Sequence, residues 1–209
     1  MSDTLPVFAI QRLRMETDGE GITTLVGVHG CPLRCKYCIN KMVWDKDTKI
    51  WNFTPEELYR QVKVDDLYFQ ATNGGITFGG GESLLHSPFI RKFKEQFAAH
   101  WNISLETSLY APAEYVEEAA KAVDFFIVDC KDWSETNYET YTGKPVSLVH
   151  ENLKLLLDVV GPSRIRVKVP HIPEYNEEKD WKYTIEQLKN LGVTDIEELT
   201  YLTGQLHAR

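Results

Sequence analysis

The fold of this chain is decided by the stretch ITTLVGVHGCPLRCKYCIN, residues 22–40. Its first part, residues 22–28, is apolar and rich in β-branched side chains, which predicts a buried β-strand. The strand runs directly into a loop that holds Cys31, Cys35 and Cys38 in the pattern C-x3-C-x2-C. Thiolates are the usual ligands of zinc and of iron-sulfur clusters, and three so close in sequence can face one centre. The spacing therefore indicates a metal centre where the strand ends.

The cysteine set is one ligand short of a closed site. Structural zinc sites and ordinary electron-transfer clusters use four protein ligands. Neither a fourth cysteine nor a nearby histidine completes the set downstream of Cys38, because the remaining cysteine, Cys130, lies in a predicted strand. A three-ligand cluster leaves one iron open to another molecule. A zinc or electron-transfer module without enzyme activity is the alternative that this pattern leaves open.

Composition favours one acidic domain. The chain has 209 residues, of which 43% are hydrophobic, and this is enough for a substantial core within a single domain spanning residues 1–209. A net charge of −8 gives no basic field for phosphates, so nucleic acid and membrane surfaces are not expected partners. The chain has no apolar run of membrane-spanning length and no signal-peptide pattern, and its crowded cysteines suit a reducing compartment. We expect a cytoplasmic monomer.

Predicted strands and helices alternate along the chain. The strands are expected at 22–28, 76–78, 103–107, 125–128, 164–169 and 196–202, and the helices at 54–70, 87–100, 113–123, 147–160 and 177–191. Thr54-Pro55 has the residues of a helix start, and Gly161 and Gly192 are typical of helix ends. This alternation predicts an α/β fold with a parallel sheet and outer helices. A flat doubly wound sheet would give the same order, so the alternation alone leaves the curvature open.

Polar residues collect where the predicted strands end. After the cysteine loop, the later strands end in Gly79-Gly80-Gly81-Glu82, Glu106-Thr107-Ser108, Asp129-Cys130-Lys131 and Lys168-Val169-Pro170. In parallel α/β barrels, functional groups lie at the carboxyl ends of the strands. Consecutive glycines also let the backbone approach a ligand closely, although a glycine run alone is more often a turn. We therefore expect one site built from several strand ends.

The cysteine loop also carries a family resemblance. With His29-Gly30 before it, Tyr37 inside it and Asn40 after it, the loop resembles that of the radical S-adenosylmethionine (SAM) enzymes, and more narrowly of the glycyl-radical-enzyme activating enzymes. The resemblance extends over residues 17–201 and implies a partial (β/α)6 barrel with a curved parallel sheet. It implies that the three cysteines hold a [4Fe-4S] cluster whose open iron binds SAM. Cleavage of SAM would then give a 5′-deoxyadenosyl radical that takes a hydrogen atom from a glycine of a partner enzyme.

The resemblance assigns roles to the later strand-end motifs. The glycine run with its acid resembles the family's GGE motif, which holds the amino group of the SAM methionine, and residues 129–131 resemble a D-x-K motif that contacts SAM. Alternation along the strand puts Asp129 and Lys131 on one face and Cys130 on the other. The residues implied in SAM binding are Tyr37, Asn40, Gly80, Gly81, Glu82, Ser104, Glu106, Asp129, Lys131, Lys168 and Pro170. The residues implied in catalysis are Lys131 and the three cysteines.

Several residues of the strand-end motifs depart from the family's pattern. Gly79 stands where serine is usual, Glu106 where aspartate is usual and Lys168 where arginine is usual. In the family, a D-T pair at the end of the third strand and the aspartate of D-x-K form a monovalent-cation site beside the methionine. Here these residues would be Glu106, Thr107 and Asp129. A lysine ammonium cannot reproduce the forked contact of a guanidinium, so we expect a different cofactor contact at Lys168.

The resemblance also implies partners. The radical would act on the glycine loop of a glycyl radical enzyme of the pyruvate formate-lyase type, and a flavodoxin or similar one-electron donor would reduce the cluster. No cysteine lies between Cys38 and Gly79, which is typical of the single-cluster class. Leu202 stands where a histidine near the adenine is expected. Activation of an anaerobic ribonucleotide reductase, and radical chemistry on a small molecule or peptide, are left open as other functions.

Overall fold

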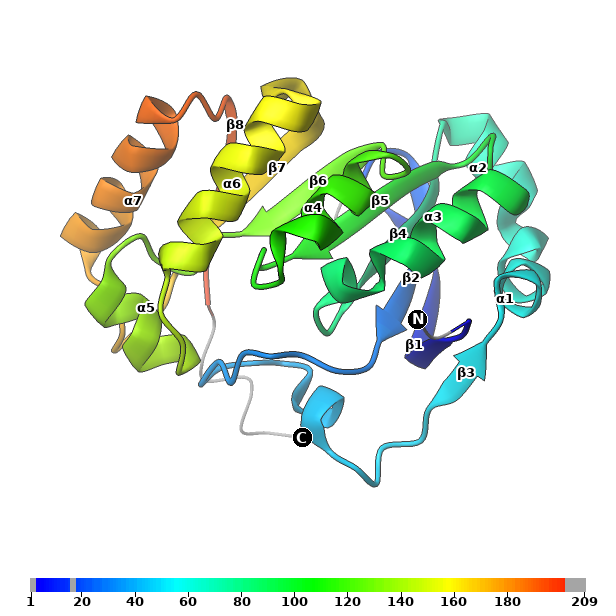
Figure 1. Cartoon of the computed structure of the whole chain (residues 1–209), viewed down its shortest axis with the longest axis horizontal. Helices are drawn as coiled ribbons and strands as arrows, with labels where there is room; N and C mark the ends of the chain where they lie inside the picture. The colour runs from blue at the N-terminus through cyan, green and yellow to red at the C-terminus, as the bar shows by residue number, and fades with distance from the viewer. Residues whose placement is uncertain (1–2, 16–17, 202–209) are drawn as a thin grey trace.

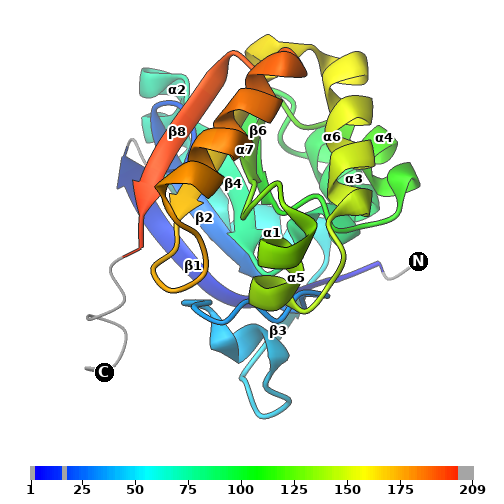
Figure 2. The same ribbon diagram turned by 90° about the vertical axis from the view of Figure 1, so that its left-hand side faces the viewer.

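The computed structural model describes residues 3–15 and 18–201. These residues form one sheet in the order β3-β1-β2-β4-β5-β6-β7-β8. The strands from β2 to β8 in this order are parallel: β2 (Ile22–Val28), β4 (Gly75–Gly80), β5 (Asn102–Thr107), β6 (Phe125–Asp129), β7 (Ile165–His171) and β8 (Asp195–Thr200). The sheet curves, and its edge strands β3 and β8 do not meet (Figures 1 and 2). The predicted partial barrel with a curved parallel sheet is confirmed.

Helices cover the outer face of the sheet (Figure 1). They are α1 (Pro55–Val62), α2 (Asp66–Thr72), α3 (Ser87–Gln96), α4 (Ala113–Ala120), α6 (Ser147–Val160) and α7 (Glu178–Asn190), with short 3-10 turns η1 (Lys41–Trp44), η2 (Lys63–Asp65), η3 (Ser83–His86) and η4 (Pro162–Arg164). The expected start of α1 is confirmed, because Thr54 and Glu57 form a reciprocal capping box. No helix within residues 3–15 and 18–201 is long and apolar enough to cross a membrane.

Three expectations about the elements are wrong. The strict alternation of six strands omits β1 (Leu5–Met15) and β3 (Trp51–Phe53), which extend the β2 edge of the sheet in antiparallel fashion. The helix expected over 54–70 is divided by η2, and the helices expected to reach 100 and 123 end at Gln96 and Ala120. The sequence analysis also omits α5 (Glu135–Thr142), which lies at the end of the barrel that holds the cysteine loop (Figure 1).

The two faces of the parallel strands have different surroundings. Val26, Phe78 and Leu105 are neighbours across β2, β4 and β5, and all are fully buried in the core beneath the helices. The alternate residues point to the inside of the curve, where Leu25 and Glu106 line a cavity. Because strand side chains alternate with a period of two, the same strands supply both the core and the functional face.

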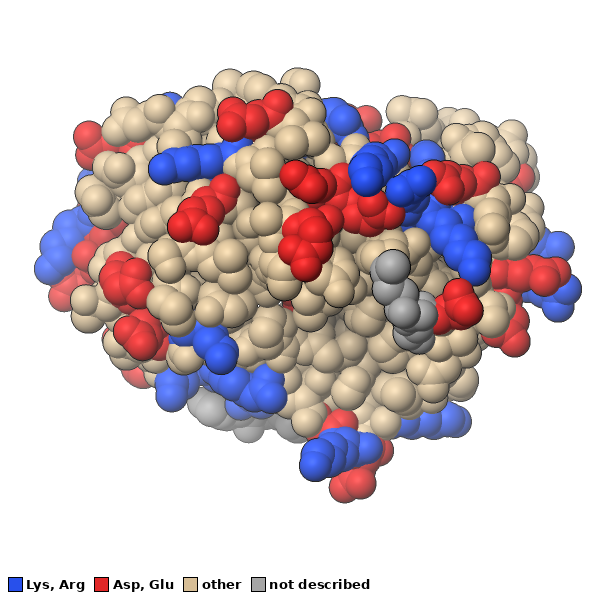
Figure 3. Space-filling model, viewed as in Figure 1, with Lys and Arg blue, Asp and Glu red and all other residues tan. Residues whose placement is uncertain are grey.

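Surface charges are interspersed on the face seen in Figure 3, where lysine and arginine lie among aspartate and glutamate. Several of them form pairs one helical turn apart, such as Arg60 with Glu56 in α1 and Lys182 with Glu178 in α7. Exposed pairs of this kind contribute about 0–1 kcal/mol. Substitutions in these exposed pairs serve as controls for substitutions in the buried charge pairs.

Asp65 in η2 is the buried partner of such a charge pair. Its side chain is fully buried, and it accepts hydrogen bonds from Arg12 Nε at 2.9 Å and from Thr24 Oγ1 at 2.8 Å. The carboxylate thereby ties β1 and β2 to the turn between α1 and α2. Asp65 makes these contacts from the 3-10 turn that divides the predicted helix.

Replacing Asp65 with alanine is expected to destabilise the fold by about 2–4 kcal/mol, because it leaves a buried threonine hydroxyl and a guanidinium without their acceptor. The hydrogen bond from Arg12 holds the pKa of Asp65 below its usual value. The folded state therefore binds this proton more weakly than the unfolded chain, so the stabilisation is present above about pH 4 and is lost as pH falls through the lowered pKa. Urea unfolding at pH 7 and pH 3 measures this, and the difference between wild type and variant should shrink at pH 3.

The exposed pair in α1 provides the matched control. Glu56→Ala should change the free energy of unfolding by less than about 0.5 kcal/mol at either pH. A loss of stability for Asp65→Ala that is no larger than this, or that grows toward pH 3, would show that the buried pair does not stabilise the fold as described.

Candidate functional site

A cavity of about 790 Å³ opens inside the curve of the sheet, at the carboxyl ends of its parallel strands. This volume lies within the usual range for small-molecule sites. The sequence-predicted residues that line it are Cys31, Cys35, Tyr37, Cys38, Asn40, Gly80, Gly81, Glu82, Glu106, Thr107, Asp129, Lys131 and Lys168. Ser104 and Pro170 do not line it: Ser104 is buried against Gly19, and the carbonyl of Pro170 accepts from Asn176. Leu202 lies outside the described residues.

The cysteine loop is held by the end of helix α5. The amide of Arg34 donates to the carbonyl of Thr142 at 2.9 Å, and the amide of Lys36 donates to the carbonyl of Tyr141 at 3.1 Å. Carbonyls in the last turn of a helix have no partner within the helix, so they are available to a neighbouring loop. The helix that sequence analysis missed therefore anchors the loop that it identified.

The thiols fit a cluster better than a single metal ion. All three are free and partly exposed. Desolvation raises the pKa of Cys31 to about 12 and that of Cys35 to about 11, so a cationic centre has to stabilise the thiolate form. In the described part of the chain, no three cysteine, histidine or acidic side chains converge as a single-ion site requires. A four-iron cluster binds each thiolate through a different iron, which suits three separate donors.

Cys130 stands apart from this set. It is 1% exposed and belongs to the hydrophobic core, on the opposite face of its strand from the cavity. Desolvation raises its pKa to about 12. Its position agrees with the alternation expected along residues 129–131.

Aromatic rings connect the cysteine loop to the segment after β7. The hydroxyl of Tyr37 donates to Glu174 at 2.7 Å, and this hydrogen bond raises the pKa of Tyr37 to about 12. The Tyr37 and Tyr175 rings meet edge to face at 5.4 Å, and Tyr141 packs against Tyr175 at 5.1 Å. The third cysteine is thus flanked by a tyrosine that is fixed from the far side of the barrel.

The loop after β4 needs glycine because its backbone lies very close to the cysteine loop. A Cβ atom at Gly81 would lie 2.2 Å from the carbonyl oxygen of Gly30, and Gly80 has a φ of 91° that favours glycine. The side-chain amide of Asn40 donates to the carbonyl of Gly80 at 3.1 Å. The loop after β4 and the loop after β2 therefore pack directly on each other, and both face the cavity.

Glu82 is buried and connects the ends of β4 and β5 by hydrogen bonds. Its carboxylate accepts hydrogen bonds from Thr107 Oγ1, from the amide and hydroxyl of Ser108, and from the amide of Leu84. Desolvation raises its pKa. Four donors occupy the acceptor sites of a carboxylate. The geometry thus gives this acid a structural contact with β5, and its predicted contact with the SAM amino group stays a prediction.

Lys131 forms a charge pair inside the cavity wall. Its Nζ lies 3.0 Å from Asp129 Oδ2 and donates to the hydroxyl of Tyr201 at 3.1 Å. Burial lowers the pKa of Lys131, but Asp129 and other nearby groups outweigh burial and raise it well above its usual value. The Lys131 residue is only 8% exposed, so this pair differs from a solvated ion pair at the protein surface.

A second pair crosses the cavity wall from β5 to β7. Lys168 Nζ lies 3.3 Å from Glu106 Oε1. Desolvation raises the pKa of Glu106, and the positive charge of Lys168 partly opposes this change. The carboxylate of Asp18 pairs in turn with Arg14 of β1, and both residues line the cavity.

Some lining residues were missed from the sequence. Phe8 and Arg14 come from β1, Tyr141 from α5, and Tyr201 follows β8. The apolar alternation at Leu5, Val7 and Ala9, and the Gly143 that ends α5, are signals that could have identified the first two elements. Tyr201 has no local signal, because its role depends on the distance to Lys131.

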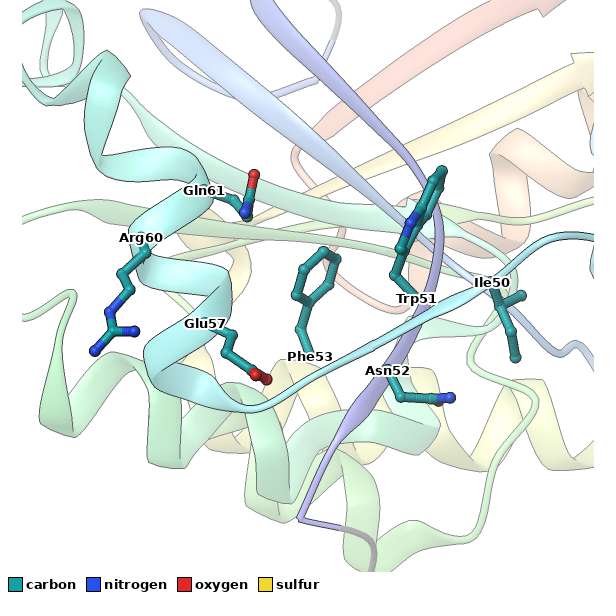
Figure 4. Close-up of a pocket in the computed structure, with 7 residues that line it drawn as sticks. All are labelled: Ile50, Trp51, Asn52, Phe53, Glu57, Arg60 and Gln61. Carbon is teal, nitrogen blue, oxygen red and sulfur yellow. The ribbon is translucent and has the colours of Figure 1, made fainter.

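A separate hollow lies at the edge formed by β3 and α1, shown in Figure 4. Trp51, Phe53 and Gln61 are among the residues that line it. Its charged members are already paired within the helix, since Glu57 caps α1 and Arg60 pairs with Glu56. We assign it no chemistry.

Comparisons with known proteins identify the family of this chain. Residues 25–200 match the model of the radical SAM superfamily. The pyruvate formate-lyase-activating enzyme of Staphylococcus aureus (strain USA300) is 31% identical over 170 residues, which cover 78% of this chain and 67% of that enzyme. A solved domain of pyruvate-formate lyase-activating enzyme from Bacteroides vulgatus ATCC 8482 is 26% identical, with a TM-score of 0.50 over 61% of this chain and 78% of that one.

A more distant structure, Streptococcus suis SuiB bound to precursor peptide SuiA, has a TM-score of 0.61 at 11% identity. The match covers 85% of this chain and 38% of that one, and it shows the fold alone. The chain belongs to the radical SAM superfamily, and within it to the relatives of the pyruvate formate-lyase-activating enzymes.

Proposed function

We propose that the chain is a glycyl-radical-enzyme activating enzyme. The observation that carries the proposal is the convergence of the three cysteines, the glycine run and the Asp129–Lys131 pair on one cavity. When bound and reduced by one electron, a [4Fe-4S] cluster would supply cleavage of SAM to methionine and a 5′-deoxyadenosyl radical, which takes a hydrogen atom from a partner glycine to give 5′-deoxyadenosine and a glycyl radical.

The residues of this chain would bind the cluster and orient SAM. Cys31, Cys35 and Cys38 would hold the cluster, and the ammonium of Lys131 would attract the SAM carboxylate. The backbone of Gly80 and Gly81 faces the same cavity and would contact the methionine half. Tyr37 and Asn40 would lie near the adenosine half. The hydrogen bonds that fix Tyr37 and Asn40 support this role, because fixed groups lose less freedom when a ligand binds.

The barrel wall would exclude water from the radical. The apolar side chains of Phe8, Leu25 and Leu33 line the cavity together with the polar groups. Since β3 and β8 leave the sheet open, an extended glycine loop of a pyruvate formate-lyase-type enzyme could enter from the side. A flavodoxin or similar donor would deliver the electron. The similarity to activating enzymes supports this partner class.

The remaining sequence predictions belong to the same proposal. One domain across residues 1–209, a monomeric state and a cytoplasmic location stay predictions. The four free thiols support the reducing compartment. The interspersed charges of Figure 3 offer no continuous basic field in that view, which suits a protein partner better than nucleic acid.

Anaerobic reconstitution with iron and sulfide tests the function. With SAM and a strong reductant, the protein should form 5′-deoxyadenosine and methionine in equal amounts, and omission of either component should stop the reaction. Incubation with a pyruvate formate-lyase-type enzyme, followed by exposure to air, should cleave that enzyme at one glycine, as mass spectrometry would show. Bound zinc, or a cluster whose spectrum does not respond to SAM, would contradict the proposal.

The two other enzyme functions predict different products in this assay. An activator of anaerobic ribonucleotide reductase would form the glycyl radical on that reductase, so that air would cleave the reductase and leave the pyruvate formate-lyase-type enzyme intact. An enzyme acting on a small molecule or peptide would form 5′-deoxyadenosine without cleaving either protein.

A further inference from the structure

The carboxylates of the cavity wall already have cationic partners from this chain. Glu106 lies next to Lys168, Asp129 next to Lys131, and Asp18 next to Arg14. The expected monovalent-cation site would need Glu106, Thr107 and Asp129 to direct oxygens to one ion. The hydroxyl of Thr107 instead donates to Glu82, and its oxygen accepts from the amide of Leu109 at 2.8 Å. The residues present do not fit a bound monovalent cation.

Strand register explains how a lysine reaches this place. Asp129 of β6 and Lys168 of β7 are direct neighbours in the parallel sheet. The side chain of Lys168 extends over β6 to Glu106 on β5, with an Nζ to Oε1 distance of 3.3 Å. Lys168 is 15% exposed at its side chain and Glu106 is 26% exposed. The ammonium therefore contacts one of the three side chains expected to bind the ion, Glu106, and it comes from the strand position next to a second, Asp129.

Gly79 fits the same arrangement. A Cβ atom at Gly79 would lie 2.6 Å from Glu106 Oε2, so the carboxylate occupies the space that a serine side chain at 79 would need. The glutamate, the glycine and the lysine at positions 106, 79 and 168 are thus mutually compatible. Each departs from the family pattern, and together they place an ammonium in the wall.

We infer that the ammonium of Lys168 replaces the monovalent cation of this site, so that SAM binding and protein stability do not depend on added sodium or potassium. The inference rests on the proposed function for its SAM component only. An ammonium donates three hydrogen bonds and carries the same unit charge as an alkali ion, so Lys168 can neutralise Glu106 without a bound ion, while Lys131 pairs with Asp129.

Salt exchange at constant ionic strength tests the inference on the reconstituted protein. The melting temperature and the Kd for SAM are measured in tetramethylammonium, sodium and potassium chloride. We expect wild type to give the same melting temperature and a Kd constant within about twofold in all three salts. Lys168→Ala should bind SAM about tenfold more weakly in tetramethylammonium chloride, because the Glu106 carboxylate in the cavity wall loses its counter-charge. Potassium, sodium or methylammonium should restore binding and raise its melting temperature.

Two further variants make the result specific. Lys168→Arg keeps the charge and should remain insensitive to the salt, whereas Lys182→Ala removes an exposed lysine and should behave as wild type. Wild type that gains affinity or stability from potassium, or a Lys168→Ala protein indifferent to every cation, would overturn the inference. The melting temperature is measured without SAM, so it tests the effect of the cation even if the protein does not bind SAM. Failure of the proposed function and failure of this inference therefore give different results.

Discussion

Replacing Cys35 with alanine is expected to abolish the formation of 5′-deoxyadenosine. The thiol faces the cavity from a loop whose backbone is fixed on both sides of it, so no neighbouring group can take its place. With two thiolates left, a four-iron cluster loses one of its three protein ligands. Chromatography of the products after anaerobic incubation with SAM and reductant measures the effect, and iron analysis of the variant should show a matching loss of cluster.

Cys130→Ala is the matched control for this change. It removes a cysteine from the same chain, but one that is buried in the core away from the cavity. We expect it to retain iron and SAM cleavage, with a loss of stability of about 1 kcal/mol. Normal SAM cleavage by Cys35→Ala, or loss of iron from Cys130→Ala, would show that the ligand assignment is wrong.

Replacing Lys131 with methionine is expected to weaken SAM binding on the order of 100-fold, or about 3 kcal/mol. The side chain is nearly buried beside Asp129, so its charge is poorly screened by solvent. Methionine has a similar length but no charge, and it leaves the carboxylate to repel an anionic ligand group. Equilibrium binding of SAM to the reconstituted protein measures the loss, while the iron content should stay at the wild-type level.

Two companions separate charge from packing at this position. Lys131→Arg keeps the charge and should lose less affinity than the methionine variant, although its planar group cannot repeat the contact with Tyr201 unchanged. Lys182→Met changes an exposed lysine of α7 and should bind SAM as wild type does. If the methionine variant bound SAM normally, Lys131 would have only a structural role in the wall.

The parallel part of the sheet could be predicted because each strand has a local signal. Residues 22–28 and 125–128 are apolar runs, and Thr54-Pro55 marks a helix start between strands. Strand β1 was not predicted because its second half is polar around Arg12 and Arg14. Its pairing with β2 is also interrupted by register shifts. Helix α5 escaped because its polar sequence, ETNYETYT, has no clear apolar face.

The site could be predicted as a set of strand ends but not as a set of contacts. The cysteine spacing and the D-x-K motif are visible in the sequence, whereas three of the four donors around Glu82 come from the end of β5, which is distant in the sequence. The pairing of Glu106 with Lys168 depends on the register and curvature of three strands. Such distances follow from tertiary packing, which local sequence does not encode.

The contact between α5 and the cysteine loop has a consequence for loading the protein. Two loop amides are already satisfied by helix carbonyls, so the loop keeps its course before any inorganic component arrives. Fixing a residue of flexible chain costs about 1–2 kcal/mol, and a loop that is ordered in advance avoids this cost during assembly. Helix α5 thus acts as a template on which the cofactor-binding turn is shaped in advance.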